Sequence, residues 1–490
     1  MSKFNLGALK ANKTVNNEGA IAYPMSDKEK LVTQVLTSFF NENKFYGDNS
    51  RDILNTVRSV IKTEPGFVAN LCIYARNEMH LRSISHVLVS ELAKSAEGKE
   101  YVRRILNKII ERPDDMTEIL AYYLTTYGKP IPNSIKKGLA NSFGKFDEYR
   151  LAKYNRKNIV KLKDILCLVH PKAKDERQND LWRRLLEDRL ETPVTWETEL
   201  SLKGNTKETW ERLIEENRLG YMAMLRNLRN IIKAGASNMN KVYEYLTNEE
   251  RVLQNKQLPF RYYSAYKTLK NEGIGTSKIY DALETAIKIS TQNIKRLPGK
   301  TLIAADVSGS MNYPVSRNSE LTCAEIAVLM LSIANYICEE TITKTFDNFL
   351  YTCNLSTQNG IIANADSIKV NGGGTDITLP LQYLLDKKIF VDRIIILSDN
   401  EINRVYTYSM DSGQPNTCQA LVERYKKWVN PNVWVHAIDM QGYGTQQFKG
   451  RNVNIIAGWS ERVFDFIYSV EQGMDSLIER IANYYFKQSG

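Results

Sequence analysis

Apolar residues in the first 300 positions recur at three- and four-residue spacing. The segments that begin at Leu31, Tyr101 and Leu181 show this pattern, which places their apolar side chains on one face of a helix. Proline and glycine separate many such stretches. Because a short helix pair needs neighbours to bury its apolar face, we predict an array of helical repeats, although no fixed-period sequence repeat is visible.

The pattern changes near residue 297. Beyond it, short apolar and β-branched runs alternate with amphipathic stretches, which include CAEIAVLMLSIANYIC and ALVERYKKW. The apolar runs begin at Thr301, Arg393, Val433 and Asn452. Strands that are apolar on both faces predict a parallel sheet covered by helices on each side. We expect one last helix in VEQGMDSLIERIANYYF and two domains, residues 1–297 and 298–490, so that the fold is mainly α with a C-terminal α/β domain.

The composition is typical of a folded protein. Of the 490 residues, 43% are hydrophobic and 25% are charged, which is the usual range for globular chains. No apolar run reaches the roughly 20 residues of a membrane span, and the N-terminal stretch lacks the apolar core of a signal peptide. The six cysteines form no C-x-x-C pair, which favours free thiols in a reducing cytosol over disulfides or zinc ligands. We therefore expect a cytoplasmic protein that does not engage a membrane.

Charge is distributed unevenly along the chain. Residues 1–300 contain 51 Lys and Arg against 36 Asp and Glu, a net charge of +15, whereas residues 301–490 contain 15 against 20, a net charge of −5. A basic first half favours a polyanionic partner. A difference in solubility between two domains is the simpler alternative.

Three loops at predicted strand ends carry oxygen ligands for a hard cation. The first strand ends in D-V-S-G-S, where Asp306, Ser308 and Ser310 alternate on one loop. The G-G-G-T-D loop adds Thr375, and Asp399 follows the next apolar strand. Ligands of open α/β folds bind at the carboxyl ends of the strands, and oxygen donors suit Mg²⁺. We predict a site for Mg²⁺ or another divalent cation.

This constellation resembles the metal-ion-dependent adhesion site of von Willebrand factor A domains, with all five ligand positions present. The resemblance implies a doubly wound sheet and an open coordination position for an acidic group of a partner. Hydrolysis is the alternative use of these carboxylates, but it needs a general base. The only histidine of the second half, His436, lies within a strand pattern and is interpreted as structural. We expect a binding site and no enzymatic activity.

The densest basic stretch runs from Ile135 to Lys174. Its spacing places several cations on one helical face, which suits a row of phosphates, and Tyr149, Tyr154 and His170 are candidates to stack on unpaired bases. A solvated helix face explains the same charges equally well. The candidate RNA-binding residues are Lys136, Lys137, Lys145, Arg150, Lys153, Arg156, Lys157 and His170.

Successive segments of the first half resemble landmarks of the TROVE module of the Ro ribonucleoprotein autoantigen family, including its bacterial relatives. In that family the module is followed by a von Willebrand A domain, as in this chain, so the resemblance covers nearly all of it. The segments are LCIYARNEMHLRSISHVLVSEL from Leu71, GKFDEYRLAKYNRKN from Gly144, KDILCLVHPK from Lys163, MLRNLRNI from Met224 and LPFRYYSAYKTL from Leu258.

The resemblance implies a monomeric ring of HEAT-like helical repeats closed by the A domain. Y-like noncoding RNA would bind the outer basic surface, and single-stranded ends of misfolded or fragmentary RNA would enter a central hole. The positions that match the family's RNA contacts are Lys153, Lys157 and His170, whereas the other five rest on local charge. An exoribonuclease such as polynucleotide phosphorylase is the implied protein partner. Arg226 and Arg229 are interpreted as structural cations that hold neighbouring helices.

Three functions are compatible with these features. The first is an RNA-binding scaffold in RNA quality control or processing. The second is a metal-dependent protein-docking module that engages an acidic residue of a partner. The third, a metal-dependent nuclease, is the least favoured of the three.

Overall fold

The computed structural model describes residues 14–15, 21–37, 50–155, 158–191, 193–257, 259–314, 321–402, 416–441, 445–457, 462–473 and 477–484. The chain forms two compact units. We call Asp27–Thr198 together with Leu477–Gly490 the helical unit, and Met1–Ser26 together with Glu199–Ser476 the mixed unit. The units divide at residue 198, whereas the α/β fold begins at residue 297, so the predicted boundary between residues 297 and 298 stays a proposal.

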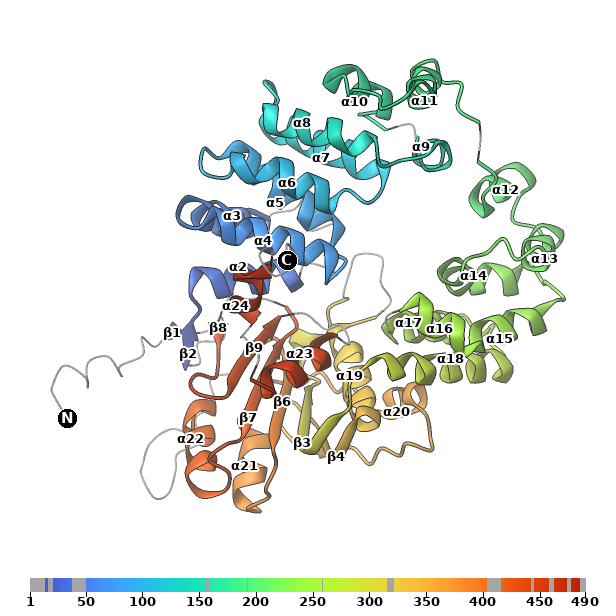
Figure 1. The fold of residues 1–490 in the computed structure, drawn as a ribbon. Coiled ribbons are helices and arrows are strands. Elements are labelled where there is room, and N and C mark those ends of the chain that lie inside the picture. The colour runs from blue at the N-terminus through green and yellow to red at the C-terminus, as the bar shows by residue number, and fades with distance from the viewer. Residues whose placement is uncertain are drawn as a thin grey trace. The chain divides into compact units, whose positions relative to one another are not determined.

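The helical unit is a stack of short helices in chain order (Figure 1). The helix predicted from Tyr101 is confirmed as α6. The stretches predicted from Leu31 and Leu181 begin inside α2 and α11, but residues 38–43 of the first lie outside the described residues, and α11 ends at Leu186, before the predicted end at Glu191. The bounds are α2 Asp27–Thr37, α3 Ser50–Thr63, α4 Pro65–Asn77, α5 Arg82–Lys94, α6 Lys99–Ile109, α7 Pro113–Tyr127, α8 Asn133–Phe143, α9 Glu148–Tyr154, α10 Leu162–Val169 and α11 Glu176–Leu186. Each helix buries one apolar face on its neighbours, as repeat arrays require.

The C-terminal segment completes the helical unit. Helix α24, Leu477–Ala482, packs on α4, and the Asn70 side-chain amide donates a hydrogen bond of 2.6 Å to the Ala482 carbonyl. Tyr484 stacks edge-on against Tyr74 at 5.2 Å between ring centroids and donates a hydrogen bond to Glu78. The last helix predicted from sequence is wrong as a single helix, because α23, Arg462–Glu471, ends before Gly473, whose φ of 83° is incompatible with helix continuation.

A buried ion cluster joins three helices inside the helical unit. The carboxylate of Asp115 accepts hydrogen bonds from Arg76 at 3.2 Å and Arg82 at 2.6 Å, and lies 3.2 Å from His86 Nε2. It also accepts the backbone N–H of Arg112. Burial by itself raises the pKa of Asp115, but the His86 hydrogen bond and the two guanidinium charges outweigh it and lower the pKa. Arg76, Arg82 and His86, which belong to the landmark segment from Leu71, therefore stabilise the fold.

The mixed unit combines helices with a six-stranded sheet. Helix α12, Trp196–Lys203, spans the division between the units, and a separate small sheet joins β1 Thr14–Val15, β2 Ile21–Pro24 and β8 Thr445–Gln446. The other α-helices of this unit are α13 Lys207–Glu215, α14 Tyr221–Lys233, α15 Met239–Thr247, α16 Glu249–Asn255, α17 Pro259–Asn271, α18 Ser277–Ser290, α19 Cys323–Ile337, α20 Ile361–Ser367, α21 Thr378–Asp386, α22 Cys418–Trp428 and α23 Arg462–Glu471.

The large sheet has the order β5-β4-β3-β6-β7-β9. The strands are β3 Leu297–Asp306, β4 Cys338–Phe346, β5 Leu350–Thr352, β6 Arg393–Ser398, β7 Trp434–Asp439 and β9 Val453–Ala457. The four strands predicted from sequence are confirmed as parallel. Sequence reasoning missed β4, and the edge strand β5 is antiparallel, so the sheet is mixed.

Helices cover both faces of this sheet, as predicted. On one face, side chains of β3 and β6 such as Leu302 and Ile394 pack with α21 and α22. Helix α19 lies against β3 and β4 on the other face. All six cysteines are free thiols, in agreement with the sequence prediction. Among the described helices, none has the length and apolar character to cross a bilayer.

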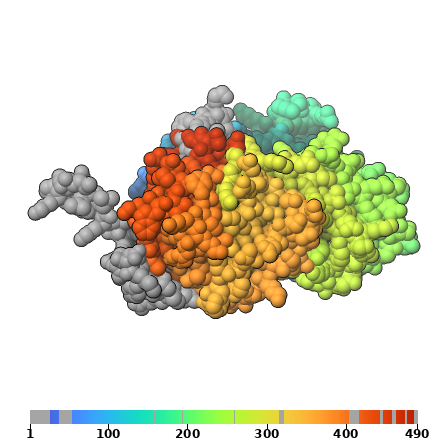
Figure 2. Space-filling model, turned by 90° about the horizontal axis from the view of Figure 1, so that it is seen from below, coloured from blue at the N-terminus to red at the C-terminus, as the bar shows by residue number. Residues whose placement is uncertain are grey.

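Helices α17 and α18 adjoin the sheet within the mixed unit, and Figure 2 shows their atoms packed directly against those of α19 and α20. The Glu284 carboxylate of α18 accepts the backbone N–H groups of Ile362 at 3.0 Å and Ala363 at 3.1 Å, at the start of α20. Lys267 of α17 forms an ion pair of 2.8 Å with Glu325 of α19. These contacts place α17 and α18 in the same compact unit as the sheet.

Candidate metal centre and basic surfaces

Four of the five predicted metal ligands lie at the carboxyl ends of adjacent parallel strands. The prediction of a strand end before Thr375 is wrong, because this residue lies on the loop between α20 and α21. Asp306 is the last residue of β3, and Asp399 directly follows β6. Two backbone hydrogen bonds tie the first loop to the glycine loop, from Gly309 N to Gly373 O at 2.8 Å and from Gly372 N to Val307 O at 2.9 Å. A Cβ on Gly309 would lie 3.2 Å from the Gly372 carbonyl oxygen, which accounts for glycine at this close approach.

Asp306 is fully buried and organises the first loop. Its Oδ1 accepts the Ser308 backbone N–H at 2.9 Å, and its Oδ2 accepts the Ser398 hydroxyl at 2.6 Å. The hydroxyls of Ser308 and Ser310 are 3.2 Å apart. Direct hydrogen bonds therefore hold three of the five predicted ligands in one cluster.

The remaining two predicted ligands, Thr375 and Asp399, are also buried. Burial, and then the charge of the Asp399 carboxylate, raise the pKa of Asp306 to about 7. Two desolvated carboxylates that repel each other form an arrangement that a divalent cation would relieve. With the hydroxyls of Ser308, Ser310 and Thr375 they offer a hard, all-oxygen donor set, which fits Mg²⁺. The residues present therefore fit the predicted ion.

Within the described residues, no group of three or more His, Cys, Asp or Glu side chains is arranged to hold a metal ion. The candidate centre is of a different composition, with two carboxylates and three hydroxyls. Sequence reasoning missed two supporting side chains. Ser398 binds Asp306, and the Gln441 amide donates a hydrogen bond of 2.8 Å to the Ser310 carbonyl. Ser398 is the last residue of β6 and Gln441 lies just after β7, so their positions at strand ends could have identified them as supporting residues.

His436 is a structural residue, as the sequence indicated. It is fully buried, and its Nε2 lies 3.0 Å from Glu471 Oε1, while Asn454 contacts its Nδ1 at 3.2 Å. Arg393 binds the same Glu471 carboxylate through two nitrogen atoms. Burial lowers the pKa of His436, despite the opposing effect of Glu471.

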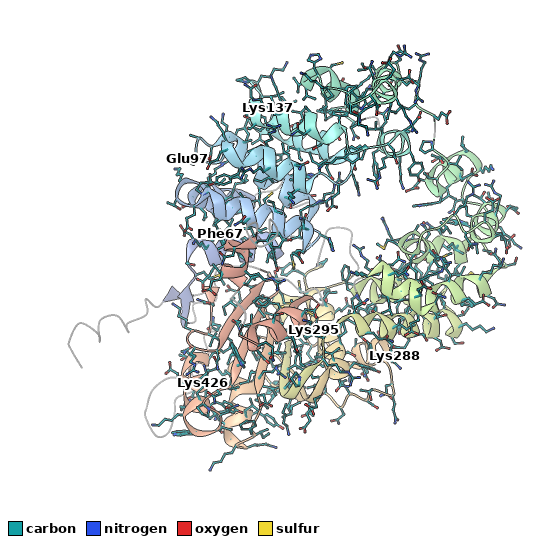
Figure 3. The ribbon with its side chains drawn as sticks, viewed as in Figure 1. Phe67, Glu97, Lys137, Lys288, Lys295 and Lys426 are labelled. Carbon is teal, nitrogen blue, oxygen red and sulfur yellow. The ribbon has the colours of Figure 1, made fainter. Side chains whose placement is uncertain are left out.

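The basic segment of the helical unit presents several exposed cations. Lys137 on α8 and Arg150 on α9 are exposed, Lys136 is half-buried, and Figure 3 shows Lys137 at the edge of its helical stack. His170 is exposed at the end of α10 with a φ of 41°. Two predicted residues, Arg156 and Lys157, lie outside the described residues.

Aromatic rings surround another predicted cation, Lys153. Its ammonium nitrogen lies 5.9 Å from the ring centroids of both Tyr149 and Tyr154, and Arg112 lies 4.8 Å from the Tyr154 ring on α9. Tyr149 is 50% exposed and His170 is exposed as well, so that two of the three rings predicted to stack on bases are accessible. Cations beside an exposed aromatic ring are typical of surfaces that bind single-stranded nucleic acids.

Lys145 differs from the other predicted RNA contacts. Its ammonium donates hydrogen bonds to the carbonyls of Asn107 and Ile110 (3.3 Å for the second), at the C-terminal end of α6. A cation at this position offsets the unpaired carbonyls of the helix end. Desolvation lowers the pKa of Lys145. The Lys145 ammonium group therefore stabilises the end of α6, a role that the local charge pattern of the sequence did not predict.

The two arginines interpreted as structural behave differently. Arg229 forms an ion pair of 3.3 Å with Glu272, just beyond α17, which agrees with the interpretation. Arg226 is exposed and takes part in no ion pair among the residues that the structure describes. The structural interpretation therefore holds for Arg229 and is wrong for Arg226.

The fold and the loops together define a helical-repeat module joined to a von Willebrand A-type domain. Residues 16–189 and 186–276 match the model of the TROVE domain, and residues 300–447 match the model of the Ro60 vWA domain. The chain therefore belongs to the family of Ro proteins, which carry both.

Individual relatives are distant. The chain is 21% identical to the RNA-binding protein RO60 of Deinococcus radiodurans over 79% of this chain and 83% of that protein. It is 25% identical to telomerase protein component 1 of Rattus norvegicus over 49% of this chain, but it spans only 12% of that protein's length. The crystal structure of the Deinococcus radiodurans RO (RSR) protein superposes with a TM-score of 0.62 at 17% identity, covering 89% of this chain and 97% of that one. This likeness shows the shared fold.

Proposed function

We propose that the chain is the RNA-binding scaffold of a Ro-type ribonucleoprotein. It binds a Y-like small noncoding RNA and the single-stranded ends of misfolded or fragmentary RNA. The observation that carries the proposal is the match of residues 16–276 to the TROVE model, because relatives in Deinococcus radiodurans and Caenorhabditis elegans are named RNA-binding protein RO60. The protein acts by holding RNA rather than by cleaving it, and an exoribonuclease such as polynucleotide phosphorylase is the proposed partner.

The cations of α8 and α9 support this proposal. Lys137 and Arg150 are exposed, and Lys153 sits beside two tyrosine rings. Of these three, Lys153 lies at a position that resembles the RNA contacts of the family, and the other two rest on local charge. Exposed lysines and arginines neutralise phosphates, and an exposed ring adds a stacking platform that tolerates any base. Such a surface binds structured RNA through its backbone and unpaired nucleotides through their faces.

Sequencing the RNA that copurifies with the protein tests the proposal directly. We expect one abundant small RNA with stem-loop structure, and affinity for it that falls linearly with the logarithm of the salt concentration. The double variant Lys137→Glu/Arg150→Glu should bind it more weakly, whereas Lys62→Glu, an exposed cation on α3, should leave binding unchanged. Absence of RNA binding, or binding that ignores salt, would contradict the proposal. RNA incubated with pure protein and Mg²⁺ should stay intact.

We propose a second, separate function for the sheet, in which Mg²⁺ held by Asp306, Ser308, Ser310, Thr375 and Asp399 captures an acidic side chain of a protein partner. The ion supplies an open coordination position, and this chain's residues orient it at the strand ends. The buried, mutually repelling carboxylates favour this use. Binding of a carboxylate-bearing partner should vanish with chelator and with Asp306→Ala, and should survive Asp386→Asn on α21. Partner capture that persists without Mg²⁺ would refute the docking function and leave RNA binding untouched.

A further inference from the structure

A concave groove in the mixed unit lies between α14 and α17. It encloses a volume of about 220 Å³. Its wall on α14 includes Leu225, Arg226 and Arg229, and its wall on α17 includes Phe260, Arg261 and Ser264. Arg226 and Arg229 are three residues apart, so that both guanidinium groups project from one face of α14. Three arginines around one small groove are a pattern that burial of apolar faces does not explain.

The charges around the groove leave it strongly positive. Arg229 and Lys233 share one carboxylate, Glu272, at 3.3 and 2.8 Å. Arg261 lies over the Phe260 ring, with 5.2 Å between its Cζ and the ring centroid. Arg226, Arg229 and Lys233 therefore meet a single acid, which leaves these residues with a net charge of +2. A ligand for this groove must therefore be an anion.

The apolar part of the groove restricts the anion further. The aliphatic side chains of Leu225 and Leu269, together with the ring of Phe260, contribute to its lining, and hydroxyls of Ser264 and Thr268 lie among them. A volume of about 220 Å³ is below the roughly 300 to 1,000 Å³ of a pocket that encloses a whole drug-sized ligand. The groove is therefore sized for one part of a longer anionic molecule, and the Phe260 ring in its lining suits a flat group.

We propose that this groove binds one nucleotide of a single-stranded RNA, with its base against the apolar lining and its phosphates at Arg226, Arg229 and Arg261. Arginine forks match phosphate oxygens in pairs, and hydroxyl side chains suit the 2′-hydroxyl or the base edges. An acidic peptide supplies the charge but no flat base, so the observations favour RNA. The inference rests on the proposed RNA-binding function but assigns it a second site, separate from the cations of α8 and α9.

Charge reversal tests the groove in the full-length protein. With a short single-stranded RNA followed by fluorescence anisotropy, Arg226→Glu/Arg229→Glu should lower affinity by at least about tenfold at 0.1 M salt, because two charge-assisted hydrogen-bond donors to phosphate are removed. The slope of log affinity against log salt should fall by about 1.4, since each phosphate that is no longer neutralised accounts for about 0.7. The control Lys278→Glu, an exposed cation on α18, should change neither quantity. Circular dichroism melting should show that all variants remain folded.

A second variant acts in the opposite direction. Glu272→Gln frees Arg229 and Lys233, so affinity for the single strand should rise by about twofold to fivefold, the range expected when a surface ion pair no longer competes. Ultraviolet crosslinking of the bound RNA should label the peptide that contains Phe260. Unchanged affinity in both variants, or displacement of the RNA by a polyglutamate peptide at lower concentration than by RNA, would overturn the inference. If the unaltered protein binds no RNA at all, the proposed function fails first. If only the α8 and α9 variant weakens binding, the groove inference fails alone.

Discussion

Basic side chains occur in two contrasting settings within the helical unit. Between α4, α5 and α7, Arg76 is buried against the Asp115 carboxylate and the Ile109 carbonyl. On α8 and α9, Lys137 and Arg150 are exposed and form no ion pair among the described residues. The first set has exchanged water for fixed partners, whereas the second keeps its hydration and can exchange it for a ligand.

Net charge alone is therefore a poor guide to the location of a nucleic-acid surface. A buried cation costs free energy unless its partner stays in place, so its removal or that of its partner damages the fold. An exposed cation contributes little to folding, and its loss is felt only by a ligand. The excess of 15 positive charges in residues 1–300 mixes both kinds. Substitutions at each kind of site distinguish the buried cations from the exposed ones.

The largest expected effect belongs to the buried cluster. Asp115→Ala removes the fully buried carboxylate that Arg76 and Arg82 share and leaves Arg76 only the half-exposed Glu111 carboxylate at 3.0 Å, so it should lower the free energy of unfolding by about 3–5 kcal/mol. Denaturant unfolding followed by circular dichroism measures this change. The matched control is Glu97→Ala, an exposed acid in the loop before α6 that is labelled in Figure 3, which should stay within about 0.5 kcal/mol of the parent. Equal effects of the two substitutions would remove the contrast on which the comparison rests.

Lowering the pH should remove the stabilising charge of the same cluster. Because the folded-state pKa of Asp115 is lowered, its ionised form favours the folded state, and this contribution is fully present above the unfolded value of about 3.9. It is lost as the pH falls below that value toward the folded-state pKa. The stability difference between the parent protein and Asp115→Asn should therefore shrink below about pH 4. A difference that stays constant from pH 7 to pH 3 would show that the charge of Asp115 is irrelevant.

The candidate metal centre holds buried charges of the opposite sign to that of Arg76. Asp306 and Asp399 repel each other, so a bound divalent cation should stabilise the fold, by about 2.7 kcal/mol when its concentration is 100 times its dissociation constant. Thermal melting with and without Mg²⁺ measures this shift. Asp306→Ala should abolish it and Asp386→Asn should retain it. A Mg²⁺ shift that survives Asp306→Ala places the ion elsewhere.

Lys145 stands between the two settings. Its ammonium binds the carbonyls at the end of α6, so Lys145→Ala should lower the free energy of unfolding by about 1–2 kcal/mol. Lys137→Ala, eight residues earlier on the same segment, should change it by less than about 0.5 kcal/mol. Identical melting temperatures for the two variants would show that the hydrogen bonds of Lys145 contribute nothing.

Sequence patterns placed Asp306 and Asp399 at strand ends because the determinants of those positions are local, whereas the bound ion stays a prediction. Asp306, Ser308 and Ser310 lie within five residues after one apolar strand, and Asp399 follows another, whereas Thr375 lies between two helices. The parallel strands then bring the separate loops to one edge. The ring closed by the A domain stays a prediction, as does the RNA that the chain binds.

Sequence patterns failed where a contact joins distant residues. Arg76 and Asp115 are 39 positions apart, and Lys145 reaches back 35 positions to Ile110. Nothing in the local spacing distinguishes these charges from exposed ones. The same limit hid the role of Arg226, because the groove exists only once α17 lies beside α14. Repeat packing, rather than helix periodicity, decides which cations are accessible.

The exposed cations Lys137 and Arg150 should have the smallest effect on stability. Lys137→Glu and Arg150→Glu, each made alone, should change the free energy of unfolding by less than about 0.5 kcal/mol, because neither side chain takes part in an ion pair among the described residues. Each should nevertheless lower the salt dependence of RNA affinity by about one neutralised phosphate, a slope change of about 0.7 to 0.9. Filter binding over a range of salt concentrations, with Glu97→Ala as the control, measures the slope. If either substitution destabilises the protein as much as Asp115→Ala does, exposure does not distinguish ligand-binding cations from structural ones. If both leave fold and slope unchanged, the RNA surface lies on other cations, and the groove between α14 and α17 is then the set to test first.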